Sequence, residues 1–465
     1  MAYTHQPAAA SSATLWRQWP LAAPKPCSST RAGRSRRPST RQWQWCPCQC
    51  QLPCSPQWAP AASGWGADSG RGSRVADTAA QTQGGAGPDR PLDAHYCEGQ
   101  ARLRLGEGFF RPQSRPSRDL GVLLARTLPQ PLQVLDLMAG SGIRALRYGL
   151  EAGAEAVWAN DADGDRLPLL EANLAPLAAA GCAVRTTALT GQKLLADCLL
   201  QERRFALLDL DAFGCPTPLV APALEALQFG GVLYLASTDG RSPTGHDRGA
   251  ALRSLGAAAR AHPASWELAL RLQIGVVARA AWALGRGVKP LFSFSEGRTF
   301  RVALQLQRRA EPQQERLLGM LAHCHGCGEQ FSQSLWQLRR WPACGCGPQA
   351  PPLAISGPLW LGPLQDPPTL GAMASAAAAL PPGAVAPASL RLLGRLQADP
   401  GLPVRCWPVA ELARRLGGGP PATEPLLMAL RQEGFTALRS GVMEATFRCN
   451  APWPRVLELA AALNR

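Results

Sequence analysis

After residue 93, the distribution of apolar and polar residues alternates between two patterns. Short apolar runs, each bounded by turn residues, occur at 132–136, 156–160, 205–211 and 231–237. Amphipathic stretches with helical spacing separate them at 143–152, 165–179, 218–226 and 250–261. Strands that alternate with helices predict a parallel, doubly wound α/β sheet. Two more apolar runs, 290–295 and 300–307, lie so close in sequence that we expect an antiparallel pair at the edge of that sheet.

The same pattern divides the chain into four parts. Residues 93–307 are the predicted α/β domain, and residues 308–370 carry a cysteine cluster. Residues 371–465 are predicted to form a small C-terminal domain. There an Ala/Pro-rich connection, 371–400, leads into two helices, two short strands and a last helix. Residues 1–92 are rich in Ser, Pro, Gln, Arg and Trp and show no helical or strand period. They are interpreted as a transit peptide, a disordered extension, or a leader translated from a start codon assigned too far upstream.

Charge and cysteine content narrow the classes of partner and compartment. The 465 residues have a net charge of +15, with 10 Lys/Arg against 3 Asp in residues 1–92 and 38 basic against 30 acidic residues in the remainder. This balance is typical of a nucleic-acid partner. Six scattered cysteines favour reduced thiols and a cytoplasmic location, or an organelle if residues 1–92 are a transit peptide. No apolar run approaches the roughly 20 residues of a membrane helix, and no feature indicates a membrane or an obligate protein partner.

A glycine-rich turn, Ala139-Gly-Ser-Gly142, follows the first predicted strand and opens a helix. Gly140 and Gly142 let backbone amides approach a ligand, and a helix N-terminus favours negative charge. Asp161 ends the next strand, where an acid accepts hydrogen bonds from both ribose hydroxyls of a nucleoside. The alternative for Asp161 is a helix N-cap. The turn and the acid together predict a nucleoside-containing cofactor.

The segment Asp209-Leu-Asp-Ala-Phe-Gly214 carries the second candidate site. Asp211 and the carbonyl of Ala212 can accept the two hydrogens of an exocyclic amine, which localises the nitrogen lone pair, and a base then takes a proton as the new bond forms. Phe213 can stack on a planar base, a contact worth about 1–3 kcal/mol. The alternative is a strand end capped by an Asp turn, with Phe213 in the core.

Two cysteine pairs, Cys324-x2-Cys327 and Cys344-x-Cys346, are separated by 16 residues. Paired thiolates at such spacing predict a tetrahedral zinc site, which is structural when all four positions are closed by protein. His323 and His325 offer spare ligands. The alternative is a lost site with free thiols.

Residues 98–465 resemble the tRNA guanine-N2 dimethyltransferases, which act on guanine 26 of tRNA. The opening segments that carry the resemblance are Glu107-Gly-Phe-Phe-Arg-Pro112, Ser117-Arg-Asp-Leu120 and residues 136–148. The later ones are Asn160-Asp161, Asp209–Gly214, Ser237-Thr-Asp239, Glu267-Leu-Ala-Leu-Arg271, Pro290-Leu-Phe-Ser293, Gly357–Leu364 and Phe447-Arg-Cys-Asn-Ala-Pro452. So many segments in one order are more specific than any single motif.

The resemblance implies a class I, Rossmann-like methyltransferase domain, a zinc-ribbon-like insert and a small α+β C-terminal domain that binds tRNA. It implies that the residues holding S-adenosylmethionine include Arg118, Asp136, Arg144 and Asp161. It also implies that Asp211 is the catalytic acid/base and that the four cysteines bind zinc.

The sequence departs from the family pattern in three places. Ala212 replaces a proline, which keeps the backbone carbonyl and loosens the loop. Thr190-Gly191 stands where an acid contacts the adenine amine of the cofactor, so Thr190 offers a hydrogen bond without charge. The second cysteine pair is one residue shorter than the usual form.

The sequence therefore predicts methylation, and by two rounds dimethylation, of the N2 amine of guanine at or near position 26 of tRNA, with S-adenosylmethionine as donor. One alternative is amino methylation of rRNA or DNA bases. The other is a catalytically inactive tRNA-binding protein.

Overall fold

The computed structural model describes residues 95–107 and 109–464, so the interpretations of residues 1–92 lie outside the described residues. A seven-stranded mixed sheet has the order β5-β4-β3-β6-β7-β9-β8. The first five strands in this order are parallel, and β9 is antiparallel to both β7 and β8. The strands are β3 (Gln133–Asp136), β4 (Ala156–Asn160), β5 (Ala183–Thr187), β6 (Phe205–Ala212), β7 (Leu227–Ser237), β8 (Gly287–Glu296) and β9 (Thr299–Gln307). The predicted doubly wound sheet and its antiparallel edge pair are confirmed.

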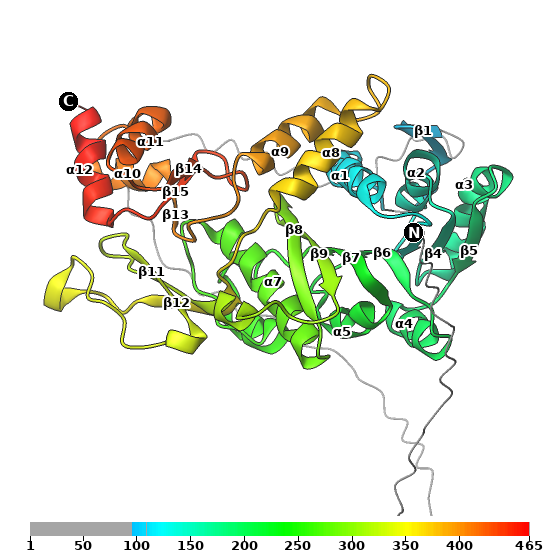
Figure 1. Ribbon diagram of the computed structural model, residues 1–465, viewed down its shortest axis with the longest axis horizontal. Coiled ribbons are helices and arrows are strands. Elements are labelled where there is room, and N and C mark those ends of the chain that lie inside the picture. Colours follow the sequence, from blue (N-terminus) through cyan, green and yellow to red (C-terminus); the bar gives the residue numbers. More distant parts are fainter. Residues whose placement is uncertain (1–94, 108, 465) are drawn as a thin grey trace, which may run out of the picture. The chain divides into compact units, whose positions relative to one another are not determined.

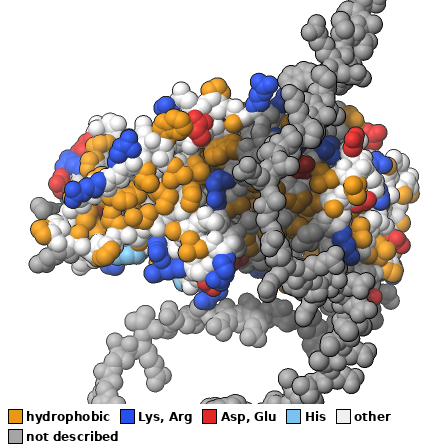
Figure 2. Space-filling view, turned by 90° about the horizontal axis from the view of Figure 1, so that it is seen from below, with side chains coloured by type: hydrophobic (Ala, Val, Ile, Leu, Met, Phe, Trp, Pro, Cys, Tyr) orange, Lys and Arg blue, Asp and Glu red, His pale blue; other side chains and the backbone are white. Residues whose placement is uncertain are grey.

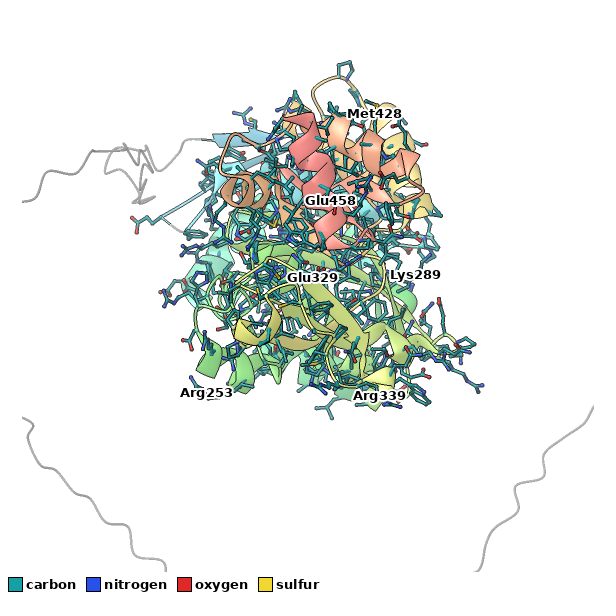
Figure 3. All side chains as sticks on the ribbon, turned by 90° about the vertical axis from the view of Figure 1, so that its left-hand side faces the viewer. Arg253, Lys289, Glu329, Arg339, Met428 and Glu458 are labelled. Atoms are coloured by element: carbon teal, nitrogen blue, oxygen red, sulfur yellow. The ribbon has the colours of Figure 1, made fainter. Side chains whose placement is uncertain are left out.

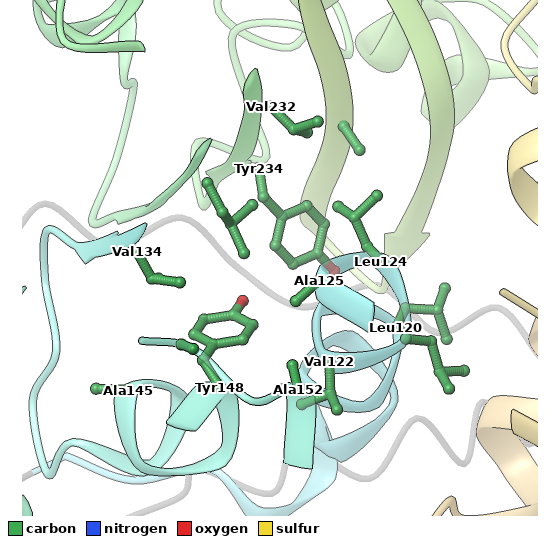
Figure 4. Packing of buried hydrophobic residues seen from close by; sticks show 14 of the residues in the cluster. Leu120, Val122, Leu124, Ala125, Val134, Ala145, Tyr148, Ala152, Val232 and Tyr234 are labelled. Carbon is green, nitrogen blue, oxygen red and sulfur yellow. The ribbon is translucent and has the colours of Figure 1, made fainter. Parts of the chain in front are cut away.

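Helices cover both faces of this sheet, because neighbouring residues of each strand enter different cores. On β3, Val134 packs into one core and Leu135 into the other, and on β7 Tyr234 and Leu235 divide in the same way. Figure 4 shows part of the first core, in which Tyr148 and Tyr234 lie near α1. The helices of the first core are α1 (Arg115–Thr127), α2 (Ile143–Ala152) and α3 (Leu167–Ala179). Those of the second are α4 (Gly191–Leu200), α5 (Thr217–Glu225) and α7 (Ser265–Ala283).

The predicted helix at 250–261 is largely wrong. The chain forms a short α6 (Arg248–Ala250) and a π-helical turn, Ala251–Leu255, and then stops at Gly256, which has a φ of +57°. An L side chain rarely adopts that conformation, so glycine ends the helix there. Regular helix resumes only with α7.

We expected the Ala/Pro-rich stretch 371–400 to be only a connection, but most of it is helical. Helices α8 (Pro367–Ala378) and α9 (Pro387–Gln397) each begin with proline, which suits the first helical turn. They bury Met373, Leu393 and Leu396 in the same core as α1, beside which Figure 1 shows them. The limits of the four predicted domains stay predictions, although this packing ties residues 367–397 to the α/β part.

Three smaller sheets complete the described chain. Antiparallel strands β10 (Leu318–His323), β11 (Gln330–Ser334) and β12 (Ala354–Trp360) carry the cysteine segment, and a hairpin of β1 (His95–Glu98) and β2 (Ala101–Arg104) precedes α1. After residue 401 the predicted helix, helix, two strands and helix are confirmed, with one strand more. They are β13 (Cys406–Pro408), α10 (Val409–Leu416), α11 (Thr423–Gln432), β14 (Ala437–Arg439), β15 (Thr446–Cys449) and α12 (Trp453–Leu463). Within the described residues, no helix has the length and apolar character needed to cross a membrane.

Candidate active site

The glycine-rich turn lies at the carboxyl end of β3, the central position for a ligand in a parallel sheet. Gly140 has a φ of +55°, and a Cβ placed on it would meet no atom within 4 Å. Gly142 has a φ of +82°, and a Cβ there would lie 2.7 Å from Leu170. The first glycine therefore leaves open space for a ligand beside the backbone, whereas the second is required for packing against α3.

Asp161 follows β4 and contacts this turn directly. Its Oδ2 accepts a hydrogen bond from the amide of Gly140 at 2.9 Å, and its Oδ1 accepts one from the amide of Asp163 at 3.0 Å. The helical turn that follows is capped by Asp163 rather than by Asp161, so the N-cap alternative is wrong. The structure brings the predicted ribose acceptor and the predicted glycine turn together.

Asn160, the last residue of β4, joins a third element to this edge. Its side-chain amide donates to the carbonyl oxygens of Leu137 and Leu189, 3.0 and 2.8 Å away. Leu189 precedes Thr190, whose hydroxyl caps α4, and Gly191, which is the first residue of that helix. The buried Asn160 therefore holds the Thr190-Gly191 turn beside the glycine-rich turn, although we predicted no role for it.

Two carboxylates lie buried beneath the site on adjacent strands, since Asp136 and Asp209 are partners in the parallel register. Asp209 accepts a hydrogen bond from the hydroxyl of Tyr148 at 2.6 Å, and Asp136 accepts one from the amide of Ala145 at 3.1 Å. Burial raises the pKa of Asp136 well above its usual value, and the Asp209 carboxylate raises it further. The neutral form of Asp136 is therefore favoured in this pair.

Asp211 lies at the end of β6, with 30% of its side chain exposed. Its Oδ2 accepts hydrogen bonds from Arg301 at 2.5 Å and from Arg144 at 3.3 Å. Burial alone would raise the pKa of Asp211, but the two guanidinium groups lower it by more, so the net shift is downward. Asp211 is thus a fixed anion at the open end of the sheet.

Phe213 is 78% exposed, which excludes the alternative that it belongs to the core. Its ring lies 5.7 Å from that of Phe109 in an edge-to-face arrangement, and Phe109 is also 61% exposed. Two large exposed aromatic rings beside an anionic carboxylate suit a planar base that carries an amine.

The loop after Asp211 is held from β7 in spite of Ala212. The hydroxyl of Thr238 donates to the carbonyl of Ala212 at 3.4 Å and accepts from the amide of Gly214 at 2.6 Å. Ser237 adds a hydrogen bond to the carbonyl of Gly214. These contacts restrain the loop at the position where the sequence lacks a proline.

Arg118 is the predicted site residue that the structure does not join to the others. Its guanidinium donates to both carboxylate oxygens of Glu98, at 2.7 and 2.5 Å, and to the carbonyls of Arg111 and Pro112. In the described part of the chain, no hydrogen bond links Arg118 to the glycine turn or to Asp161. Arg144, by contrast, binds both Asp209 and Asp211.

The four cysteines form one cluster in spite of the shortened second pair. The Sγ atoms of Cys324, Cys327, Cys344 and Cys346 all lie within 4.8 Å of one another. Two of these separations are 3.4 and 3.7 Å, close to the roughly 3.8 Å expected around a tetrahedral zinc with bonds of about 2.3 Å. The donor set therefore fits structural zinc. The spare ligands His323 and His325 are not part of this group.

The cysteine loop also supports the C-terminal core. The indole of Trp453 donates to the carbonyl of Cys327 at 2.7 Å, and that of Trp407 donates to the carbonyl of Gly328 at 2.9 Å. Glu329, labelled in Figure 3, lies below the C-terminal helices and 3.7 Å from Arg405. A metal in the cluster would fix the surface on which this core rests.

Comparison with known proteins assigns the chain. Residues 102–461 match the family model "N2,N2-dimethylguanosine tRNA methyltransferase". The chain belongs to this family. A tRNA (guanine(26)-N(2))-dimethyltransferase of Methanosphaerula palustris is 31% identical over 361 residues, which are 77% of this chain and 91% of that protein. The corresponding enzyme of Thermococcus kodakarensis is 31% identical over 364 residues, or 76% and 92% of the two chains.

A solved structure gives the same assignment. The complex of Trm1 from Pyrococcus horikoshii with S-adenosyl-L-methionine superposes with a TM-score of 0.69 at 25% sequence identity. The match covers 79% of this chain and 99% of the other. The Rossmann-like methyltransferase fold expected from the resemblance is confirmed.

Sequence reasoning gave no role to Phe109 or Arg301. Phe109 lies in the opening segment that carries the family resemblance, but nothing in the sequence places it beside Phe213. Arg301 is the single charged residue of the strand Thr299–Gln307, and a charged residue is almost never fully buried without a partner. This isolated charge is the feature of the sequence that could have indicated a buried ion pair at Arg301.

Proposed function

We propose that this protein transfers methyl groups from S-adenosylmethionine to the N2 amine of guanine 26 in tRNA, and that two rounds give N2,N2-dimethylguanosine. The observation that carries the proposal is the convergence of three strand ends. Because β4 and β6 flank β3, Asp161, the glycine-rich turn and Asp211 lie at the carboxyl ends of three neighbouring strands. Membership of the family supplies the class of donor and acceptor.

The residues at the β3 and β4 ends fit the donor. When bound, S-adenosylmethionine supplies an activated methyl group on a sulfonium. Asp161 can accept hydrogen bonds from the ribose hydroxyls, and the open space at Gly140 admits the ligand beside the backbone. Thr190 and Gly191 would contact the adenine, Asp136 would hold the turn through the amide of Ala145, and Arg144 and Arg118 would pair with the methionine carboxylate. Arg118 must first exchange its contacts with Glu98 for that role.

The residues at the β6 end fit the acceptor. The guanine must leave the tRNA stack to reach Asp211, and Phe213 and Phe109 offer it two aromatic faces. Asp211 and the carbonyl of Ala212 would each accept one hydrogen of the N2 amine. The N2 lone pair forms the new N–C bond, the S–C bonding pair stays on sulfur, and one N2 proton leaves to the carboxylate of Asp211 and then to water.

The C-terminal part and the overall charge suit a tRNA partner. The net charge of the chain is +15, and Figure 2 shows Lys and Arg side chains around an area of hydrophobic ones on the face seen from below. Domain 371–465 is proposed to contact the tRNA, with electrostatic attraction to its phosphates. We place the reaction in the cytoplasm, with an organelle as the alternative if residues 1–92 are a transit peptide.

The test is methyl transfer by the Asp211→Asn variant. We expect transfer of labelled methyl to tRNA to fall by about 10²–10⁴-fold, because an amide cannot accept the proton. S-adenosylmethionine affinity, measured by calorimetry, should stay within about twofold, since Asp161 and the glycine turn are intact. Asp197→Asn, at a half-buried position of α4 where the carboxylate accepts from Gln201, is the matched control with unchanged transfer.

Three results would contradict the proposal. Equal loss of cofactor affinity and transfer would show that Asp211 does not act on the amine. If nucleoside mass spectrometry finds the label on rRNA or DNA, or on a tRNA base other than guanine 26, the proposed substrate is wrong. If the protein binds tRNA but not S-adenosylmethionine, it is the catalytically inactive tRNA-binding protein of the alternative hypothesis.

A further inference from the structure

Arg301 reaches Asp211 from two strands away. In the sheet registers Asp211 pairs with Ala236 and Ala236 pairs with Arg301, so the three residues form one row across β6, β7 and β9. Neighbouring strands lie about 4.8 Å apart, so the two backbones are separated by roughly 10 Å. Only a long side chain spans that gap, and the small Ala236 leaves room for it to cross.

The aromatic ring of Tyr234 contacts both guanidinium groups that bind Asp211. The guanidinium of Arg301 lies 5.3 Å from the ring centroid, and that of Arg144 lies 5.9 Å from it. The hydroxyl of Tyr234 donates to the carbonyl of Ser117 at 2.8 Å, which fixes the ring between the sheet and α1. Cation–π contacts of this kind orient guanidinium groups that are removed from water.

The two oxygens of Asp211 have different surroundings. Oδ2 accepts from both Arg301 and Arg144. Among residues 95–107 and 109–464, no hydrogen bond involves Oδ1, and the side chain is 30% exposed. One oxygen is therefore anchored, while the other has no hydrogen bond in the described part of the chain and belongs to a partly exposed side chain.

This arrangement is costly for folding. Arg301 is 2% exposed, and its Nε and Nη1 are buried without a hydrogen-bond partner in the described part of the protein. An unsatisfied buried donor costs on the order of 1–3 kcal/mol. A surface ion pair would hold Asp211 without that cost, so stability alone does not account for a buried arginine here.

We propose that Arg301 is the positioning residue of the methyl transfer: it anchors Oδ2 of Asp211 so that Oδ1 is presented to the N2 amine of the guanine. This inference rests on the proposed function. The downward shift of the Asp211 pKa agrees with it, because Arg301 is the strongest of the groups that oppose the effect of burial. Asp211 then remains ionised in mildly acidic solution. It is a weak base, so the N2 proton leaves after the N–C bond has begun to form.

The experiment compares Arg301→Gln with Arg301→Lys in the full-length protein. For Arg301→Gln we expect kcat for tRNA methylation to fall about 10²-fold, since a small misplacement of a catalytic group has that effect. KM for tRNA and the Kd of S-adenosylmethionine should stay within about threefold. The acidic limb of the kcat–pH profile should move to higher pH, because the Asp211 carboxylate loses a neighbouring cation. Arg301→Lys keeps the charge and should recover most of kcat and the original limb.

Arg308→Met is the control, because this exposed arginine follows β9 and lies over the ring of Phe229, 4.5 Å from its centroid. It should behave as the wild type. An unmoved acidic limb, or equal kcat in Arg301→Gln and Arg301→Lys, would overturn the inference. Collapse of the melting transition in both variants would make Arg301 a structural residue and overturn it as well. If the wild type and both variants methylate tRNA guanine equally well, the inference about Arg301 fails and the proposed function stands. If the wild type does not methylate tRNA guanine, the proposed function itself fails.

Discussion

Two of the groups of buried arginines and carboxylates among the described residues differ in how completely their carboxylates are paired. The first, which we call the joint network, is formed by Glu267 and Arg271 of α7 with Asp399 and Arg448. Glu267 accepts from Arg448 at 3.0 and 2.7 Å and from Arg271 at 2.9 Å. Asp399 accepts from Arg448 and from the amides of Gly401 and Gly441. All four carboxylate oxygens of this network have a donor.

The second group, the site cluster of Asp136, Arg144, Asp209, Asp211 and Arg301, is incompletely paired. Asp136 and Asp209 each have one buried oxygen without a hydrogen-bond partner among the described residues, and Arg301 has two such nitrogens. The joint network attaches the C-terminal strand β15 to α7. Its carboxylates are completely paired, and its one buried nitrogen without a hydrogen bond among the described residues, Nε of Arg448, still lies 2.7 Å from Oδ1 of Asp399. The site cluster bears unsatisfied groups that folding does not need, which is expected where function opposes stability.

The strongest test of this contrast is Arg448→Met. Removing the fully buried guanidinium leaves Glu267 and Asp399 without their main cation, and breaking such a buried pair costs about 3–5 kcal/mol. The free energy of unfolding, from urea titration, should fall by that amount. Arg455→Met removes a half-exposed arginine from its pairs with Glu433 and Glu458 and should cost far less, because ion pairs at the surface contribute little. A loss at Arg448 no larger than at Arg455 would remove the distinction between the two regions.

Acid titration sharpens the comparison through Glu267. Burial alone would raise its pKa, but Arg448 and Arg271 lower it to about 2. A depressed folded-state pKa means that the stabilisation is fully present above the ordinary value near 4.5 and is lost as the pH falls toward about 2. The loss is on the order of 3 kcal/mol. Urea titrations between pH 6 and pH 3 should show stability falling below about pH 4.5 in the wild type.

The Glu267→Gln variant is the control for that titration. It should be less stable than the wild type at pH 6 and should show a flatter profile below pH 4.5, because the titrating group is absent. Parallel profiles in the two proteins would assign the acid sensitivity to other carboxylates.

The parallel sheet was predictable because its central strands are buried on both faces and therefore form continuous apolar runs. The edge strand β5, Ala183–Thr187, has no buried residue and shows no such run, so it was missed. The stretch 371–400 was interpreted wrongly because Ala and Pro are common in linkers. Pro387, however, stands at the start of a helix, and Leu392, Leu393 and Leu396 have helical spacing. Local composition did not reveal that α1 offers these leucines a surface.

The site was predictable where one short segment holds its chemistry. Asp161 and Gly140 each follow a predicted strand and Asp211 ends one, and the topology of a parallel sheet brings such positions to one edge. Phe109 comes from an opening loop and Arg301 from an antiparallel strand, and only the folded chain brings Phe109 to Phe213 and Arg301 to Asp211. The contact of Arg118 with Glu98 depends on the β1–β2 hairpin, whose two four-residue strands were not predicted.

The smallest effect is expected at the cofactor end of the site, from Thr190→Asp. Asp is as good an N-cap as Thr, so α4 should keep its first turn. A carboxylate accepts a stronger hydrogen bond from the adenine amine than a hydroxyl does, because charge-assisted bonds are about twice as strong as neutral ones. The Kd of S-adenosylmethionine, measured by calorimetry, should fall by about two- to fivefold. Thr190→Ser keeps the cap without the charge and should leave the Kd unchanged. If Thr190→Asp raises the melting temperature without changing the Kd, Thr190 is only a helix cap and the adenine lies elsewhere.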